Sequence, residues 1–153
     1  MWGYELNHYG VKGMKWGVRK QKDGHHEYRV EKMRKSGTLS VMENLLDIAV
    51  KNGDIVLKIN TGAQIKHLPS AKGFKEGRSY LEGDLQRAEE LYKELLGTGE
   101  PIVNKDGVWL KKERVSSPNV EGYHLDKDDN RTATNKLMIV YSVKGSHLFP
   151  RKE

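Results

Sequence analysis

The side chains best suited to proton transfer and phosphate binding fall in two stretches of this chain. The first stretch lies between residues 61 and 81 and carries Lys66, His67, Arg78 and Ser79. The second lies near the C-terminus and carries Thr134, Tyr141, Ser142, Lys144 and His147. Histidine titrates near neutrality, and arginine matches phosphate oxygens in a bidentate way. The set suits cleavage of RNA by its own 2′-hydroxyl, which needs a base, an acid and donors for the pentavalent phosphate, and no metal or cofactor is expected.

The C-terminal residues 135–150 are expected to form a hairpin. An apolar strand runs into Lys144-Gly145, and the returning strand carries His147. A two-residue loop would place Ser142 directly opposite His147 on one face and Tyr141 opposite Leu148 on the other. The hairpin would then bring a histidine, a hydroxyl and a lysine to one end of an apolar ribbon.

Other interpretations of these residues stay open from the sequence alone. His67 could be an ordinary exposed loop histidine, and Arg78 could form a surface salt bridge. The pair His25-His26 is a weak candidate for metal binding, and the sequence predicts no metal site. The polar segment 126–131 lacks the glycine and glutamate of a calcium loop, which favours a solvated turn.

Composition restricts the class of protein. The chain has 153 residues, 31% of them charged, and no cysteine, which excludes disulfides and thiolate zinc sites. No apolar run is long enough to span a bilayer, and no signal peptide is visible. Residues 1–35 hold 9 Lys/Arg against 4 Asp/Glu, whereas the remainder holds 18 against 17. The basic excess therefore belongs to the N-terminal arm, and nucleic-acid binding by the main domain would require a local basic patch.

The pattern of elements predicts an α+β fold, with helices packed on a small, mainly antiparallel sheet of four strands. A capping box at Ser40 and Glu43 opens a helix within 36–52, and an apolar stripe indicates a second helix over 84–96. Between them, 54–59 should be a strand or extended connection and 61–81 a loop. Strand and turn signals follow the second helix, namely a hairpin over 101–115, a short strand over 120–125 and a central strand over 136–143.

From about residue 60 to 150 the chain resembles the polymorphic toxin type 50 domain. The resemblance rests on several spaced motifs: Lys66-His67-Leu68, Phe74-x-x-Gly77-Arg78-Ser79-Tyr80-Leu81, Gly97-Thr98-Gly99-Glu100, Asn104-Lys105-Asp106-Gly107-Val108-Trp109, Lys112-Glu113-Arg114-Val115 and Tyr141-Ser142-x-Lys144-Gly145-Ser146-His147-Leu148-Phe149-Pro150. The resemblance implies a ribonuclease toxin of the barnase–EndoU–colicin–RelE type. It favours a functional role for His67 over the loop interpretation.

The resemblance assigns expected roles to the two stretches. Catalytic roles fall to His67, His147, Arg78, Lys144 and Ser142. The resemblance implies substrate binding by Lys66 and Ser79. Substrate binding is also expected of Tyr141 and Thr134, whose hydroxyl groups belong to the C-terminal stretch. The order in which the two histidines act as base and acid stays open.

The N-terminal residues 1–35 are expected to be a flexible basic leader, followed by a helix and connection over 36–59 and the toxin-type domain over 60–153. Residues 8–19 resemble the leader "HxGVxGMKWGVR" of phage and prophage proteins. We expect this leader to dock onto a phage head or portal component through residues 1–20. The residues expected to dock are His8, Tyr9, Gly10, Gly13, Met14, Trp16, Gly17 and Arg19.

The sequence as a whole predicts a phage- or prophage-encoded, metal-independent endoribonuclease that leaves a 2′,3′-cyclic phosphate. Its expected partners are RNA and an immunity or antitoxin protein, and its expected location is the virion or the host cytoplasm, with no membrane association. Two alternatives remain: a non-enzymatic head-associated structural or nucleic-acid-binding protein, and a toxin fold reused as an inhibitor of host defence.

Overall fold

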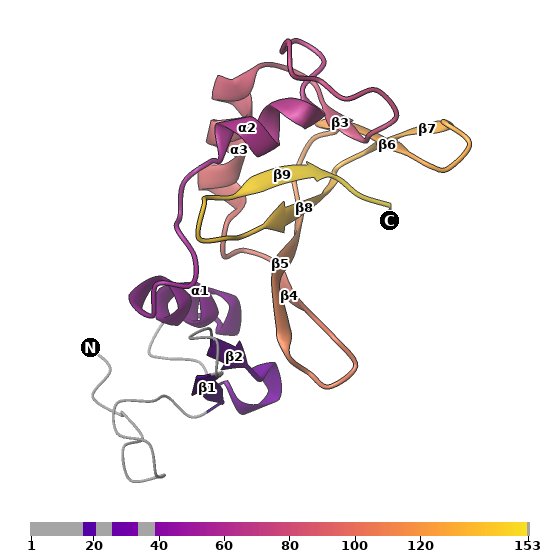
Figure 1. The fold of residues 1–153 in the computed structure, drawn as a ribbon. Coiled ribbons are helices and arrows are strands. Elements are labelled where there is room, and N and C mark those ends of the chain that lie inside the picture. Colours follow the sequence, from indigo (N-terminus) through magenta and orange to yellow (C-terminus); the bar gives the residue numbers. More distant parts are fainter. Residues whose placement is uncertain (1–16, 21–25, 34–38, 153) are drawn as a thin grey trace, which may run out of the picture.

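The computed structural model describes residues 17–20, 26–33 and 39–152, and within these ranges the fold is α+β (Figure 1). The helical elements are η2 (Val30–Lys32), α1 (Val41–Lys51), α2 (Thr61–Gln64), η3 (Ile65–His67) and α3 (Leu85–Leu95). The strands are β1 (Val18–Lys20), β2 (His26–Tyr28), β3 (Tyr80–Leu81), β4 (Glu100–Val103), β5 (Trp109–Ser116), β6 (Gly122–Leu125), β7 (Arg131–Thr134), β8 (Lys136–Val140) and β9 (His147–Pro150).

The described residues form three antiparallel sheets, and the largest has four strands in the order β4-β5-β8-β9. Strand β8 lies inside this sheet, as its apolar run predicted. The smaller sheets are β3-β6-β7 and the pair β1-β2. The expectation of one small sheet is therefore only partly confirmed.

Both predicted helices are present, and local sequence explains where they begin. The Ser40 hydroxyl accepts the Glu43 N–H while the Glu43 carboxylate accepts the Ser40 N–H, so the capping box of α1 is confirmed. At α3, the Asp84 carboxylate accepts the Arg87 N–H. The predicted stripe of α3 faces inward, with Ala88, Leu91, Tyr92 and Leu95 buried.

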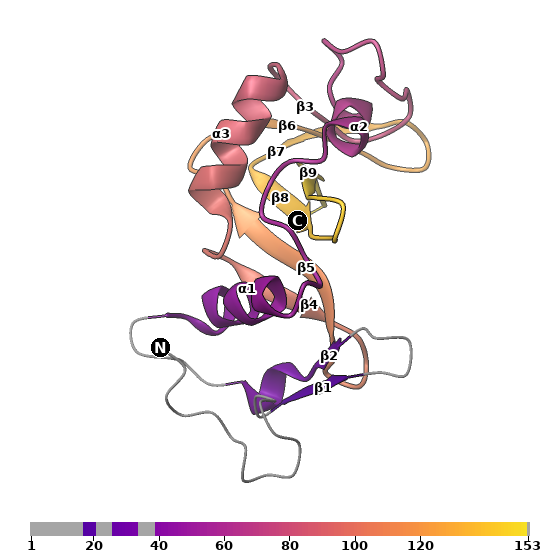
Figure 2. The ribbon, with the colours of Figure 1, turned by 60° about the vertical axis from the view of Figure 1, so that its left-hand side comes forward.

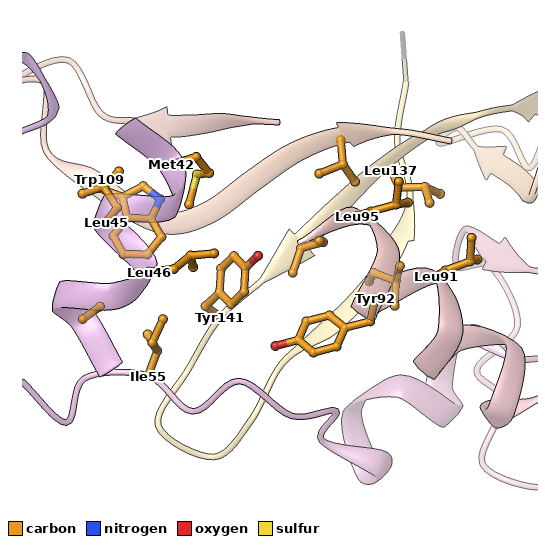
Figure 3. Close-up of a cluster of buried hydrophobic side chains, with 14 of the residues drawn as sticks. Met42, Leu45, Leu46, Ile55, Leu91, Tyr92, Leu95, Trp109, Leu137 and Tyr141 are labelled. Carbon is orange, nitrogen blue, oxygen red and sulfur yellow. The ribbon is translucent and has the colours of Figure 1, made fainter. Parts of the chain in front are cut away.

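The core lies between the helices and one face of the four-stranded sheet. Figure 3 shows side chains of α1 and α3 meeting Leu137, Tyr141 and Trp109 of the sheet side. Figure 2 shows α1 near β4 and β5, with α3 further along the same sheet. Strand residues alternate in direction, so the other side chains of β5, β8 and β9 point to the opposite face, called here the open face, where they are half-buried or exposed.

The C-terminal hairpin forms, but its predicted register is wrong by two residues. His147 pairs with Val140 and Leu148 with Ile139, so the loop runs from 141 to 146. The reason is a competing partner: Ser146 exchanges backbone hydrogen bonds with the passing segment at Lys58 and Asn60. A shift of two keeps every side chain on its predicted face, because strand side chains alternate with period two.

The segment 54–60 is an extended connection that forms an isolated parallel bridge between Ile59 and Ser146, and its Val56 N–H donates to the Ser142 carbonyl of the hairpin loop. The stretch 61–81, expected to be a loop, instead begins with α2 and η3. The Asn60 side chain caps α2 by accepting the Ala63 N–H, a signal present in the sequence but overlooked among the surrounding glycines and Pro69. This short helical turn carries His67 toward the sheet.

The described parts of residues 1–35, which were expected to be a flexible leader, include side chains that are buried in the core. Val18, Tyr28 and Met33 are buried in the core cluster, and Tyr28 meets Trp109 edge-on at 5.8 Å between ring centroids. The Tyr28 hydroxyl also donates to Asp54 at 2.5 Å. Burial of these apolar side chains against the main domain is stabilising. The sequence of 1–35 has no periodic pattern that would predict this packing.

No helix in the described ranges is long and apolar enough to cross a membrane.

Candidate active site

The two candidate histidines lie side by side. The rings of His67, from η3, and His147, from β9, are nearly parallel at 11°, with centroids 5.6 Å apart. His67 is buried and His147 is half-buried. The two stretches identified in the sequence therefore meet in space at this pair.

Phe149 completes a group of three rings that sequence reasoning missed. Its centroid lies 4.8 Å from that of His67 and 5.7 Å from that of His147. His147 and Phe149 are two residues apart on β9, so both point to the open face of the sheet. Period-two alternation in the hairpin was the signal that could have identified Phe149.

Gln64 holds η3 against β9. Its amide nitrogen donates to the Leu148 carbonyl at 2.9 Å, and its amide oxygen accepts the Leu148 N–H at 2.8 Å. Gln64 is fully buried, and β9 is an edge strand whose outer backbone groups need partners. The side chain therefore takes the place of a neighbouring strand, and it fixes the helical turn that ends in His67.

A backbone carbonyl sets the tautomer of His67. Its Nδ1 lies 2.8 Å from the carbonyl oxygen of Ser79. A carbonyl can only accept, so Nδ1 carries the proton, and in the neutral ring Nε2 bears the free lone pair. This arrangement prepares Nε2 to accept a proton from a substrate.

Both histidines have lowered pKa values. Burial is the main cause at His67; the bond to Ser79 opposes it, and the charges of Arg78 and Lys66 add to it. Burial also lowers the pKa of His147, to about 4, with further contributions from His67, Lys66, Arg78 and Lys112. Both rings are therefore neutral at pH 7 in the free protein. A bound phosphate anion would raise both pKa values by offsetting the nearby positive charge.

Two of the predicted cations, Lys66 and Arg78, lie near the pair. Both are exposed, and both act electrostatically on the two histidines. Among the described residues no carboxylate forms an ion pair with Arg78, so the surface salt bridge considered from the sequence is absent there. Lys112, on β5, is a third cation acting on His147 that the sequence did not single out.

Ser142 and Lys144 lie in the hairpin loop. The Ser142 hydroxyl donates to the Gly145 carbonyl at 2.7 Å and accepts the Lys144 N–H at 3.2 Å. Lys144 is exposed, and its charge is not among those lowering the pKa of His147. The structure thus gives Ser142 a part in shaping the turn, and the backbone N–H of Lys144 takes part in the same turn.

Tyr141 and Thr134 are not brought to the histidines. Tyr141 is buried on the inner face of the sheet, where its hydroxyl donates to Glu113 at 2.6 Å. Thr134 is buried at the end of β7, and its hydroxyl oxygen accepts the Lys136 N–H. Their contacts belong to the core and to a strand junction.

Ser79 connects His67 to a third histidine that the sequence did not single out. The Ser79 hydroxyl accepts the Leu125 N–H at 3.0 Å and lies 3.2 Å from Nδ1 of His124, on β6. The pairing of β3 with β6 brings these residues together, although His124 lies far along the chain. Nothing in the local sequence around His124 indicates this contact.

Of the residues expected to dock a partner, only Gly17 and Arg19 lie within the described residues. Gly17 has φ +91°, and its carbonyl accepts the Arg29 N–H at 2.8 Å. A side chain there would meet Lys32. Arg19 is exposed on β1. The others, His8, Tyr9, Gly10, Gly13, Met14 and Trp16, lie outside the described ranges, as does His25.

The part of the chain that the structure describes contains no group of three or more histidine and carboxylate side chains able to hold a metal.

Comparison with known proteins gives two family matches. Residues 59–150 match the family described as Ntox50, bacterial toxin 50. Residues 4–23 match a family of unknown function, DUF7211. No curated protein matches the chain.

Proposed function

The chain belongs to the bacterial toxin 50 family, and on the basis of its paired histidines we propose that it is a metal-independent endoribonuclease. It would cleave RNA by attack of the 2′-hydroxyl on the adjacent phosphate and leave a 2′,3′-cyclic phosphate. The observation that carries this proposal is the nearly parallel pair of His67 and His147, 5.6 Å apart, whose pKa values the charges of Lys66 and Arg78 help to lower. A fold of the barnase–EndoU–colicin–RelE type is part of the proposal.

His67 is the base in this mechanism. Its Nε2 takes the proton of the 2′-hydroxyl as the bond between the 2′-oxygen and phosphorus forms. The Ser79 carbonyl then stabilises the resulting imidazolium, because it already accepts the Nδ1 proton. A positioned base of this kind contributes roughly 10²- to 10⁴-fold to a rate.

His147 is the acid. Substrate phosphate raises its pKa and lets the ring bind a proton, which passes to the 5′-oxygen as the bond between that oxygen and phosphorus breaks. Lys66 and Arg78 stabilise the charge that builds on the pentavalent phosphate. Because the pKa of His147 is about 4 in the free protein, activity should be highest below neutral pH.

The test uses purified protein and a defined RNA oligonucleotide in EDTA. Wild type should cut the strand and leave 2′,3′-cyclic phosphate ends, and a 2′-deoxy residue at the cut site should block cleavage. His67→Ala and His147→Ala should each lose at least about 100-fold in rate, while Lys93→Ala, on the exposed side of α3, should not. A broad RNA panel left intact by wild type would refute the proposal.

Expression in a bacterial host separates this proposal from a non-enzymatic binding protein or an inhibitor built on a toxin fold. An active ribonuclease should arrest growth, and His147→Ala should restore it. Wild type that is well tolerated, with cellular RNA intact, would favour the non-enzymatic alternatives.

In a second part of the proposal, residues 1–20 dock the protein onto a phage head or portal component. This part rests on the resemblance of residues 8–19 to the leader of phage proteins, since the family that matches residues 4–23 has no known function. A reporter protein fused to residues 1–20 should be found in purified virions. The same reporter with Trp16→Ala and Met14→Ala should be excluded. Exclusion of both fusions would contradict the docking role.

A further inference from the structure

The open face of the four-stranded sheet carries a band of positive charge on β5 and β8, which begins in the row that holds His147. Strand register places Lys112, Val140 and His147 in one row across β5, β8 and β9. The next row on the same face is Arg114, Met138 and Phe149. A third row pairs Ser116 with Lys136.

These rows contain no carboxylate, because the acidic residue of β5 points the other way. Glu113 is fully buried on the inner face, where it accepts hydrogen bonds from Tyr141, Gly97 and Gly99. The nearest acid across the sheet is Glu100 of β4, which is 80% exposed and 4.0 Å from Arg114. An exposed pair at this distance contributes little, so Arg114 remains available to a ligand.

Half-buried Val140 and Met138 separate the cations from the ring group. Neighbouring strands lie about 4.8 Å apart, so Lys112 starts about 10 Å across the sheet from His147. Successive rows are about 7 Å apart along the strands. The band therefore extends well past the histidines, with apolar side chains between its cations and the rings.

We propose that Lys112, Arg114 and Lys136 form a binding track for single-stranded RNA, holding phosphates next to the one at the histidines. The inference rests on the proposed function for the identity of the ligand. It goes further by naming a single strand of several nucleotides as the substrate class. Unpaired bases can lie on the apolar side chains of Val140 and Met138 within the rows, whereas the stacked bases of a duplex cannot. The main domain has almost no net charge, so this band is the local basic patch that RNA binding requires.

The test measures binding of 2′-O-methyl RNA, which lacks the attacking hydroxyl and so cannot be cut by the proposed reaction. Fluorescence anisotropy should show that wild type binds an octamer more tightly than a dinucleotide, and more tightly than the same octamer annealed to its complement. The logarithm of the binding constant falls linearly with the logarithm of the salt concentration, with a slope of about 0.7 for each phosphate contacted in a single strand. In the triple variant Lys112→Gln, Arg114→Gln, Lys136→Gln, the slope of log binding constant against log salt concentration for the octamer should therefore be shallower by about 2. The affinity for the dinucleotide should be unchanged.

A matched control removes the same charge elsewhere, with Lys20→Gln, Lys93→Gln and Lys105→Gln, all exposed. It should retain the wild-type slope. An unchanged slope in the track variant, an equal loss in the control, or equal affinity for the duplex would overturn the inference. An acidic protein as the true occupant would also leave the RNA slope unchanged. If binding follows expectation but wild type cuts no RNA, the track stands and the proposed activity fails.

Discussion

Gln64 and Leu148 exchange two hydrogen bonds in the interior of the protein, although 84 residues separate them in the chain. Through this contact a side chain of α2 occupies the edge of β9 beside His147. The helical turn that begins at Gln64 ends at His67. One amide group thus sets the distance between the two histidines of the candidate site.

Replacement of this amide should reduce both stability and activity. Gln64→Ala leaves the N–H and the carbonyl of Leu148 without their partner, and each buried unpaired group costs about 1–3 kcal/mol. Denaturant unfolding should therefore show a loss of about 2–6 kcal/mol for the two groups. In the fraction that remains folded, kcat should fall because His67 is no longer held over β9. Gln86→Ala, on the exposed side of α3, is the matched control and should change neither quantity.

The lowered pKa of His147 makes stability depend on pH. The unfolded ring titrates near 6.5 and the folded ring near 4, so between these values the unfolded state binds more protons. Stability is therefore full above about pH 6.5 and falls as the pH drops toward 4. Between about pH 4 and 6.5, the unfolding free energy of His147→Phe should change less with pH than that of wild type. Equal slopes would contradict the assigned pKa.

The same pKa can be measured directly. An NMR titration of the free protein should give a His147 midpoint near 4, and saturating inorganic phosphate should raise it. If the His147 midpoint is the same with and without phosphate, the anion does not bind beside this ring.

Tyr141 should prove to be a core residue. Its hydroxyl donates to buried Glu113, and burial raises the pKa of that carboxyl. Tyr141→Phe removes one of three donors to Glu113 and should cost about 1–3 kcal/mol of stability, with RNA cleavage by the folded protein unchanged. Tyr123→Phe, on half-exposed β6, provides the control. A large loss of kcat in Tyr141→Phe without loss of stability would restore the substrate-binding role expected from the sequence.

Lys66 and Lys144 should differ in their contribution to catalysis. The charge of Lys66 acts on both histidines, whereas that of Lys144, in the exposed turn, is not among the charges acting on either. We expect Lys66→Ala to lower kcat/KM by about 10- to 100-fold, in line with the loss of one charge-assisted contact to phosphate. Lys144→Ala should stay within about 3-fold of wild type. Steady-state kinetics of both variants, each checked for an unchanged melting temperature, would decide.

Much of the local structure could be predicted because its causes are local. The capping box at Ser40 and the apolar stripe of α3 act within one or two helical turns. Alternation in the C-terminal hairpin placed His147 on the correct face, even though the register was wrong. The register depended on Ser146 pairing with Lys58 and Asn60, a contact between distant segments that turn rules do not include.

The candidate site was predicted less completely than the elements that carry it. The residue types and spacing of His67, Arg78 and His147 indicated proton transfer and phosphate binding from the sequence alone. Phe149 was missed although alternation in the hairpin placed it on the same face as His147. Gln64 and His124 were missed because an edge-strand cap and a cross-sheet hydrogen bond leave no local pattern. Ser142 was included because the predicted register placed it opposite His147, and Tyr141 and Thr134 were included because their hydroxyl groups belong to the same C-terminal stretch.

The sequence by itself determined which groups are available for chemistry, where the helices begin and which strand faces are apolar, since these follow from side-chain type and short-range periodicity. Tertiary structure decided which of those groups meet. His67 reaches His147 only because Gln64 binds the edge of β9, and Lys112 and Arg114 form a basic band only because β5 and β8 pair in one register. Such contacts form between segments that are distant in the chain, so their energy cannot be read from either segment alone.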